Sequence, residues 1–387
     1  MGEELKDARL RAVLAAAGAT LSARERITLP KLPSDAVLLS VVRHRGRYFR
    51  FRRWRGRTTP LRVLSKKQVE PLLVGLRDEL EFGKVSEMRA LKVYLRRAYD
   101  RLLADALPRG ARRLLLSGDG LLRYVPVHAF LQPVSPRSAK ARFLVSALAI
   151  AQVPSLSALS QAKSSALAGM DVLLPAYGSP ALGRRPLSGG AQEAAFLERW
   201  AKNAKLELKV RRGPAATPEA LLASLSRRRW GVHFAGHGIA DLRPGSPPEL
   251  LFPRREAGLT VARITAKPVA ASLVVLASCT TAYVARFRGA GQPASRPSQG
   301  GSPTATQLAP VNLAEALLAR GAGAVVAASW NVKDRQSAAQ MAQFYSHLRR
   351  HGAAEALARA QRRRIARLRP PHPRYWAFYA LYGAPGW

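Results

Sequence analysis

A histidine and a cysteine that each follow an apolar run are the residues best suited to covalent chemistry in this chain. His237 and Gly238 follow the run WGVHFAG, and Cys279 follows the run LVVLAS, 42 residues after the histidine. The carboxyl ends of parallel strands meet at one edge of an open sheet, so we expect the imidazole and the thiol to converge there. An imidazole that accepts the thiol proton generates a thiolate nucleophile. The pattern therefore predicts a His–Cys dyad.

Each residue of the dyad has an expected role. His237 is the candidate general base and then acid, Cys279 is the candidate nucleophile, and the backbone N–H groups of Gly238 and Cys279 are candidate oxyanion donors. His233 lies four residues before His237 on the same face of a strand, so spacing alone does not choose between the two imidazoles. Because Cys279 is the only cysteine, intrachain disulfides and multi-thiolate metal sites are excluded. We expect no metal and no cofactor.

The charge of the chain is strongly positive. The 63 Lys and Arg residues against 24 Asp and Glu give a net charge of +39. Arginine greatly exceeds lysine, which is the bias of a GC-rich coding sequence. The basic residues are also scattered along the chain and form no nucleic-acid recognition motif. We therefore expect non-specific, salt-sensitive nucleic-acid binding, and a nucleic-acid-binding effector is the weakest alternative function. With no signal peptide and no apolar run of membrane-spanning length, we expect a cytoplasmic protein that contacts no membrane and keeps its thiol reduced.

The pattern of the chain changes near residue 165. Residues 1–34 are predicted to form a helix at 5–18 and a linker. In 35–165, alternating apolar residues predict a strand meander at 36–64, helical spacing follows at 68–108, and a strand at 113–116 enters a Gly-Asp-Gly turn.

Strands and helices alternate in 166–387, which predicts an α/β fold with a parallel sheet covered by helices on both faces. Thr217 is a predicted N-cap, and Asn312 begins a helix with capping-box spacing. The segment 286–310 is rich in Gly, Pro, Ser and Gln, so we expect a mobile loop beside the dyad. The other expected elements of this part are strands at 171–174, 206–210 and 324–328 and helices at 190–202 and 335–350.

Several segments, taken in order, resemble the CHAT domain family, which is related to caspases, gingipains and separase. The resemblance covers roughly residues 35–387. The segments are DGLLRYVP at 119–126, PSLSAL at 154–159, the His-Gly pair at 237–238, LASCTT at 276–281, AGAVVAASWNVKD at 322–334 and YWAF at 375–378.

This resemblance implies a caspase-like catalytic core in 166–387 and a pseudo-caspase-like half before it in 35–165. It implies a cysteine endopeptidase with His237 and Cys279 as its dyad, acting on protein substrates under the control of a regulatory or sensor protein, in bacterial signalling or defence. Relatives commonly have an acidic residue and then Thr-Gly after the cysteine, where this chain has TTA at 280–282. A catalytically silent scaffold or interaction protein is therefore the main alternative.

Asp334 has two interpretations. In related proteins such as separase, an acidic residue of this region lies near the pocket for a basic side chain before the scissile bond, so the resemblance implies a substrate-binding residue. Its position before the helix at 335–350 equally predicts an N-cap. Glu193 is interpreted as a first-turn acid of its helix, while His233 and His128 are expected to be structural.

Overall fold

The computed structural model describes residues 31–135, 140–160, 169–175, 186–239, 248–253, 258–282 and 312–386. The predicted helix at 5–18 and the predicted loop at 286–310 lie outside these ranges. The predicted boundary near residue 165 also falls between described segments, so the division into parts remains a prediction.

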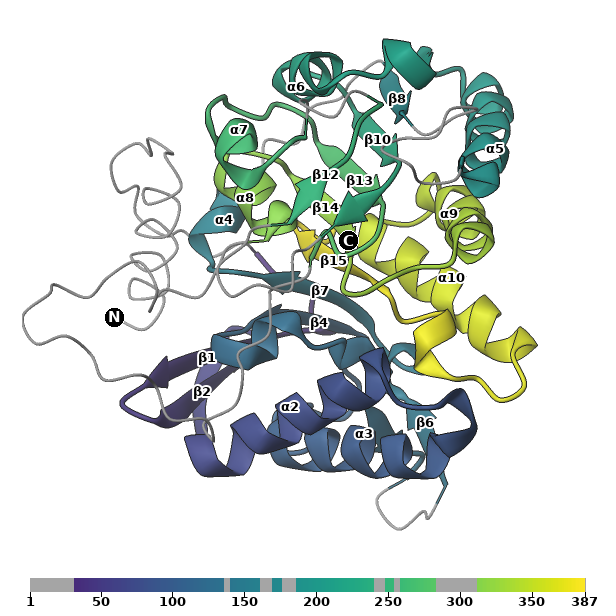
Figure 1. Ribbon diagram of the computed structural model, residues 1–387. Helices are drawn as coiled ribbons and strands as arrows, with labels where there is room; N and C mark the ends of the chain where they lie inside the picture. The colour runs from purple at the N-terminus through teal and green to yellow at the C-terminus, as the bar shows by residue number, and fades with distance from the viewer. Residues whose placement is uncertain are drawn as a thin grey trace, which may run out of the picture.

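Across the described ranges, eleven strands form one sheet in the order β3-β2-β1-β4-β7-β15-β14-β13-β10-β8-β9 (Figure 1). These strands are β1 (Ala36–His44), β2 (Arg47–Trp54), β3 (Arg57–Ser65), β4 (Arg113–Ser117), β7 (Ala149–Val153), β8 (Met170–Leu174), β9 (Leu208–Arg212), β10 (Gly231–Ala235), β13 (Leu273–Ala277), β14 (Ala324–Ala328) and β15 (Tyr379–Gly383). Short strand pairs are β5 (Leu131–Pro133) with β6 (Ala141–Phe143), and β11 (Gly238–Ile239) with β12 (Glu249–Leu250). The α-helices are α2 (Lys66–Glu81), α3 (Met88–Leu102), α4 (Ser157–Ser160), α5 (Ser188–Ala204), α6 (Pro218–Ser226), α7 (Val261–Thr265), α8 (Leu313–Ala319), α9 (Asp334–Leu348) and α10 (Ala353–Arg367). The 3-10 helices are η1 (Val85–Glu87), η2 (Gly120–Tyr124), η3 (Val127–Ala129), η4 (Leu144–Ser146), η5 (Gly213–Ala215) and η7 (Pro373–Tyr375).

The first three strands form the predicted antiparallel meander. Its two turns contain Arg45–Gly46 and Arg55–Gly56, and all four residues have positive φ. Two consecutive residues with positive φ are typical of a type I′ hairpin, whose twist matches that of the flanking strands. Most other neighbouring strands are parallel, and β15 is antiparallel only to β14. The sheet is therefore mostly parallel, as expected.

The sheet is covered on both faces, and β13 shows how. Val275 packs in the core cluster that includes residues of α5, α9 and α10, while Val274 packs in the cluster of α6, α7 and α8. Figure 1 shows these helices around the sheet. Successive side chains of a strand point to opposite faces, so a strand buried on both faces reads as a continuous apolar run. This explains the unbroken LVVLA sequence before the cysteine. The expected α/β fold with helices on both faces is confirmed.

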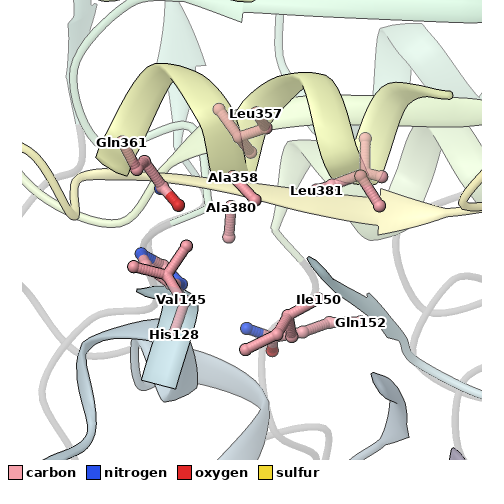
Figure 2. A pocket seen from close by; sticks show the side chains of 10 residues that line it. His128, Val145, Ile150, Gln152, Leu357, Ala358, Gln361, Ala380 and Leu381 are labelled. Carbon is pink, nitrogen blue, oxygen red and sulfur yellow. The ribbon is translucent and has the colours of Figure 1, made fainter. Parts of the chain in front are cut away.

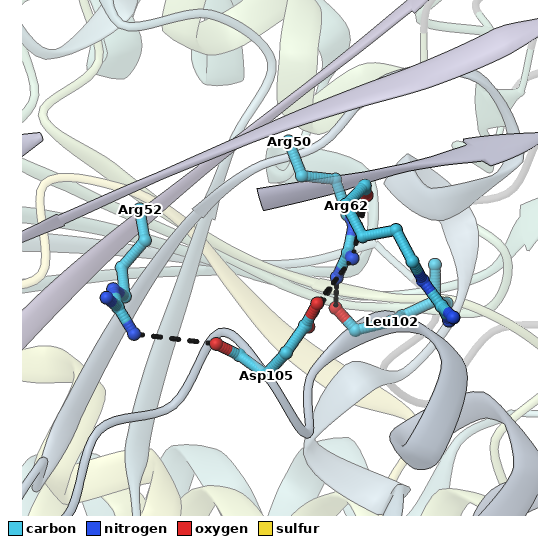
Figure 3. A network of polar contacts seen from close by, with 5 residues as sticks. All are labelled: Arg50, Arg52, Arg62, Leu102 and Asp105. Carbon is cyan, nitrogen blue, oxygen red and sulfur yellow. Dashed lines mark hydrogen bonds and ion pairs between the residues drawn. The ribbon is translucent and has the colours of Figure 1, made fainter. Parts of the chain in front are cut away.

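Polar contacts hold the amino-terminal part of the sheet to its helices. Arg50 of β2 is 1% exposed and donates to both carboxylate oxygens of Asp105, each at 2.7 Å (Figure 3). Its guanidinium also donates to the carbonyl oxygens of Arg62 and Leu102. A buried charge is tolerated only when it is paired and hydrogen-bonded, and Arg50 is both. This one side chain therefore joins β2, β3 and the end of α3.

The predicted caps are present where the chain enters two helices of the carboxyl-terminal part. The hydroxyl of Thr217 accepts from the backbone N–H of Ala220 at 3.1 Å, at the start of α6. The side chain of Asn312 accepts from the backbone N–H of Glu315 at 2.9 Å, and Glu315 completes the capping box of α8. Both caps confirm the sequence-based helix starts.

Candidate active site

The two strand ends predicted to form the dyad lie side by side. Strands β10 and β13 are parallel neighbours, and Ala235 pairs with Ala277 (Figure 1). His237 follows Ala235 by two residues, as Cys279 follows Ala277. The side chains of both His237 and Cys279 are partly exposed. The register of the sheet therefore brings the backbones of both residues to the same edge.

Gly238 shows how closely the two segments approach. A Cβ atom at Gly238 would lie 2.6 Å from Oγ of Ser278 and even closer to the carbonyl oxygen of Cys279. Only glycine permits such an approach. The carbonyl of His237 accepts from the N–H of Leu251 at 2.9 Å, and Gly238 pairs with Leu250 in the short β11–β12 ladder. The segment that carries the histidine is therefore held on one side by β12 and on the other by Cys279.

The thiol has a backbone donor from the loop after β14. The N–H of Val332 donates to Sγ of Cys279 at 3.3 Å, and the thiol of Cys279 donates to the carbonyl oxygen of Val332 at 3.6 Å. A donor to sulfur stabilises a thiolate more than a thiol. Sequence reasoning missed this contact because nothing in the sequence pairs residue 332 with residue 279.

The residue after the cysteine has an unusual backbone. Thr280 has φ of 56°, in the left-handed region that β-branched residues rarely adopt. Its N–H lies 3.4 Å from the carbonyl oxygen of Trp330, and the hydroxyl of Thr281 accepts from the N–H of Ala328 at 2.9 Å. These contacts hold the turn against the end of β14. Backbone strain at one residue costs about 1–3 kcal/mol and persists where the surroundings fix it.

Asp334 does not form the predicted cap of its own helix. Helix α9 begins at Asp334, and its N-cap residue is Lys333. The carboxylate of Asp334 instead accepts from the backbone N–H of Gly189 at 2.5 Å and lies 3.4 Å from Oγ of Ser188, at the start of α5. A carboxylate stabilises the positive end of a helix dipole wherever it comes from in the sequence. The expectation of an N-cap for 335–350 is therefore corrected to a cap of α5 supplied by α9.

His233, four residues before His237, forms a buried pair with Glu193. His233 is fully buried, and its Nε2 lies 2.9 Å from a carboxylate oxygen of Glu193. The expectation that His233 is structural is confirmed. The interpretation of Glu193 as a first-turn acid is wrong, because α5 begins at Ser188, which puts Glu193 in the second turn, and the residue is only 3% exposed.

His128 is structural as expected. Its Nε2 lies 2.9 Å from the carbonyl oxygen of Ala377, and burial lowers its pKa from 6.5 to about 4. It lines a cavity of about 10 Å³ together with Gln152 and Gln361, between β7, β15 and α10 (Figure 2). That volume holds about one water molecule. The lining contains none of the predicted site residues, so this cavity is no substrate pocket.

Comparison with protein families identifies the chain. A family model described as CHAT domain matches residues 92–384. The chain belongs to the CHAT domain family. The first three strands precede the matched region of the CHAT domain, yet they continue its sheet through the parallel pairing of β1 with β4.

Two solved structures are similar to this chain. A chain of the Saccharomyces cerevisiae separase–securin complex is 12% identical and has a TM-score of 0.56; the match covers 98% of this CHAT protein and 31% of that chain. The Arg specific cysteine proteinase gingipain R is 12% identical with a TM-score of 0.45, over 83% of this chain and 76% of its own. The separase match shows a caspase-like fold, as expected.

The present chain spans about a third of the separase-complex chain that it matches. Comparison with curated proteins gives no match. Within the described ranges, no helix is both long enough and apolar enough to cross a bilayer. Within the same ranges, no group of three or more His, Cys, Asp or Glu side chains could hold a metal ion.

Proposed function

We propose that this CHAT protein is a cysteine endopeptidase that cleaves protein substrates with His237 and Cys279. The observation that carries the proposal is the paired register of β10 and β13, which brings both residues to one edge of the sheet, with Gly238 packed on the backbone of Cys279. A caspase-like fold supports it. The partial exposure of both side chains supports access for a peptide.

The proposed reaction begins when His237 accepts the thiol proton of Cys279. The thiolate attacks the scissile carbonyl carbon and forms a C–S bond, while the carbonyl π electrons move to oxygen. Backbone N–H groups of Gly238 and Cys279 stabilise the resulting oxyanion. The imidazolium then donates its proton to the leaving amine as the C–N bond breaks. Water attacks the thioester, with His237 again as base, and regenerates the thiol and a carboxylic acid product.

We propose that cleavage follows a basic residue. The Coulombic effects of Glu193, Cys279 and Asp334 all help to raise the pKa of the Tyr379 hydroxyl, after the larger effect of its burial. Of the two carboxylates, Glu193 is buried and paired with Ser337 and His233, whereas Asp334 is partly exposed, so Asp334 is the one that could meet a substrate side chain. Negative charge in a partly buried site favours a cationic side chain. Asp334 would then bind substrate with the part of its carboxylate that α5 does not occupy.

Control by a regulatory or sensor protein is the remaining part of the proposal. A protease in a reducing compartment such as the cytoplasm must be kept silent until it is needed, and the separase match comes from a complex with securin. We propose that a partner of this kind acts on the present chain, in bacterial signalling or defence.

Cleavage of a peptide library tests the proposal. A proteome digested with a protease of different specificity is incubated with the protein, and new termini are identified by mass spectrometry. We expect Cys279→Ala and His237→Ala to abolish the new termini, with a basic residue enriched before each cut. His44→Ala, which changes an exposed histidine of β1, is the matched control. Persistent cleavage by Cys279→Ala would refute the assignment.

A catalytically silent scaffold is the alternative, and the residues after Cys279 favour it, because the family resemblance implies an acidic residue where this chain has Thr280, and that threonine has a left-handed backbone. Labelling with a chloromethyl ketone peptide separates the two functions. An activated thiol reacts quickly near neutral pH and an unactivated thiol reacts slowly. Labelling of the wild type that is lost in His237→Ala supports the peptidase. Equal, slow labelling of both proteins supports the scaffold.

A further inference from the structure

Five buried polar side chains form a connected network directly beneath the candidate active site. They come from four elements and are each less than 10% exposed: Glu193 of α5, His233 of β10, Ser337 and Tyr345 of α9, and Tyr379 of β15. Buried polar groups are costly unless every member has a partner, and a fully paired network fixes one arrangement of the elements that carry it. The network therefore specifies how these four elements sit together.

The direction of each hydrogen bond follows from the carboxylate. Glu193 can only accept, so Ser337 donates its hydroxyl hydrogen to one carboxylate oxygen at 2.8 Å and His233 donates from Nε2 to the other at 2.9 Å. The only hydrogen of Ser337 is then used, so Tyr379 must donate to Oγ of Ser337 across 2.8 Å. Tyr345 lies 3.0 Å from Nδ1 of His233, and its pKa is raised well above 10 by burial, so it stays protonated.

The network connects both sides of the dyad. His233 lies on β10, four residues before the candidate base His237. Ser337 lies five residues after Val332, whose N–H donates to the candidate nucleophile. One helical turn before Ser337, the carboxylate of Asp334 binds the N–H of Gly189, which is itself one turn before Glu193. Helices α5 and α9 are therefore linked twice within one turn, at the ends nearest the thiol.

We propose that Ser337 and Glu193 are positioning residues, which hold the start of α9 so that the N–H of Val332 stays directed at Sγ of Cys279. The inference rests on the proposed function of that thiol. Without the Ser337 link, α9 keeps its apolar contacts through residues such as Phe344 and its contact from Asp334 to Gly189, but it loses one of the two polar contacts that join it to α5. The loop before α9 then samples positions in which the thiolate has no backbone donor.

Alkylation of the single thiol by iodoacetamide across a pH series tests this role without a peptide substrate. For Ser337→Ala we expect the alkylation profile to move to higher pH by up to about one unit, which is up to about tenfold slower alkylation at pH 7. With a cleavable peptide, kcat should fall with little change in KM, since the change acts on the nucleophile and not on substrate binding. Ser337→Thr restores the hydroxyl and should restore the profile.

Ser224→Ala is the matched control, because Ser224 is 1% exposed and lies on α6, across the sheet from the network. Its alkylation profile should equal that of the wild type. Glu193→Gln and Tyr379→Phe provide two further variants if Ser337→Ala does not fold, with the larger shift expected for Glu193→Gln. An unchanged profile in folded Ser337→Ala overturns the inference and leaves the network purely structural.

The two proposals can fail separately. If the alkylation profile of the wild type is the same as that of His237→Ala, the proposed dyad is refuted. A shift of the profile in Ser337→Ala would still support the positioning role, because the N–H of Val332 donates to the sulfur without help from the imidazole. If the dyad is active and Ser337→Ala matches the wild type in profile and kcat, only the positioning role fails.

Discussion

Gly238 packs so closely on the carbonyl of Cys279 that no side chain fits between them. We expect Gly238→Ala to push the His237 segment away from the thiol, because its Cβ would also lie 2.6 Å from Oγ of Ser278. Overpacking of this kind costs about 1–3 kcal/mol of unfolding free energy. If His237 activates the thiol as proposed, the rate of chloromethyl ketone labelling should fall at least about tenfold, because the imidazole would be moved away from Sγ. Urea denaturation and labelling kinetics measure the two effects.

Gly190→Ala is the control for this substitution. A Cβ at Gly190 would meet Leu174 and Leu187 at 3.8 Å, which is ordinary van der Waals contact. Alanine is favoured over glycine in a helix by about 1 kcal/mol, so this variant should be as stable as the wild type or more stable. Equal labelling of Gly238→Ala and Gly190→Ala would show that the close approach has no role in reactivity.

Asp334→Asn separates the two roles of Asp334. Asparagine keeps an oxygen that accepts from the N–H of Gly189, so we expect a loss of no more than about 1 kcal/mol in stability. Loss of the negative charge should reduce kcat/KM for peptides cleaved after arginine by at least about tenfold, while chloromethyl ketone labelling with an apolar peptide is unchanged. Asp334→Ala should lose stability as well, by about 0.5–2 kcal/mol. Undiminished cleavage after arginine by Asp334→Asn would assign Asp334 to capping alone.

Local patterns in the sequence predict the elements near the dyad well. The apolar runs that end at Ala235 and Ala277 are strands, and the caps at Thr217 and Asn312 begin helices. These predictions hold because propensity, capping and burial on both faces act over a few residues. The rule for parallel sheets places the two strand ends at one edge, and the structure adds that β10 and β13 are neighbours.

Long-range pairing is what the sequence does not reveal. Strand β15 lies at the centre of the sheet between β7 and β14, although it is the last strand of the chain. Glu193 has its partner His233 on another element, so its helical position alone suggests a solvent-exposed acid. Asp334 caps a helix that begins 146 residues earlier, at Ser188. Such contacts depend on tertiary packing, which no local pattern encodes.

A buried ion pair joins the 3-10 helix η2 to the helix α8. Arg123 of η2 lies 2.6 Å from the carboxylate of Glu315 of α8, whose side chain is 1% exposed. We expect Arg123→Met to cost about 3–5 kcal/mol, because it leaves a buried carboxylate without its cation. The double variant Arg123→Met/Glu315→Gln has no buried carboxylate, and the introduced glutamine can still complete the capping box of α8. We therefore expect it to recover part of the unfolding free energy that Arg123→Met loses.

A double-mutant cycle from urea denaturation measures the coupling of this pair. Arg96→Met removes the exposed pair of Arg96 with Asp100 on α3 and should cost no more than about 1 kcal/mol. If Arg123→Met costs as little as Arg96→Met, the ion pair does not hold η2 to α8.

Buried histidines make stability depend on pH. Burial lowers the pKa of His128 from 6.5 to about 4, and burial with the charge of Arg374 lowers that of His372 to about 4. Between pH 4 and pH 6.5 the histidines of the unfolded chain bind more protons than those of the folded one. The contribution of the neutral histidines to the unfolding free energy is therefore fully present above pH 6.5 and is lost as the pH falls toward 4. The shift at His128 corresponds to about 3 kcal/mol.

His128→Gln tests this dependence, because an amide can still donate to the carbonyl of Ala377 but does not titrate. The unfolding free energy, from urea titrations at pH 7 and pH 5, should drop less between the two pH values in His128→Gln than in the wild type. His44→Gln removes an exposed histidine and should leave the wild-type drop unchanged. A drop of the same size in all three proteins would mean that His128 is not held neutral by burial, and that the acid sensitivity comes from other groups.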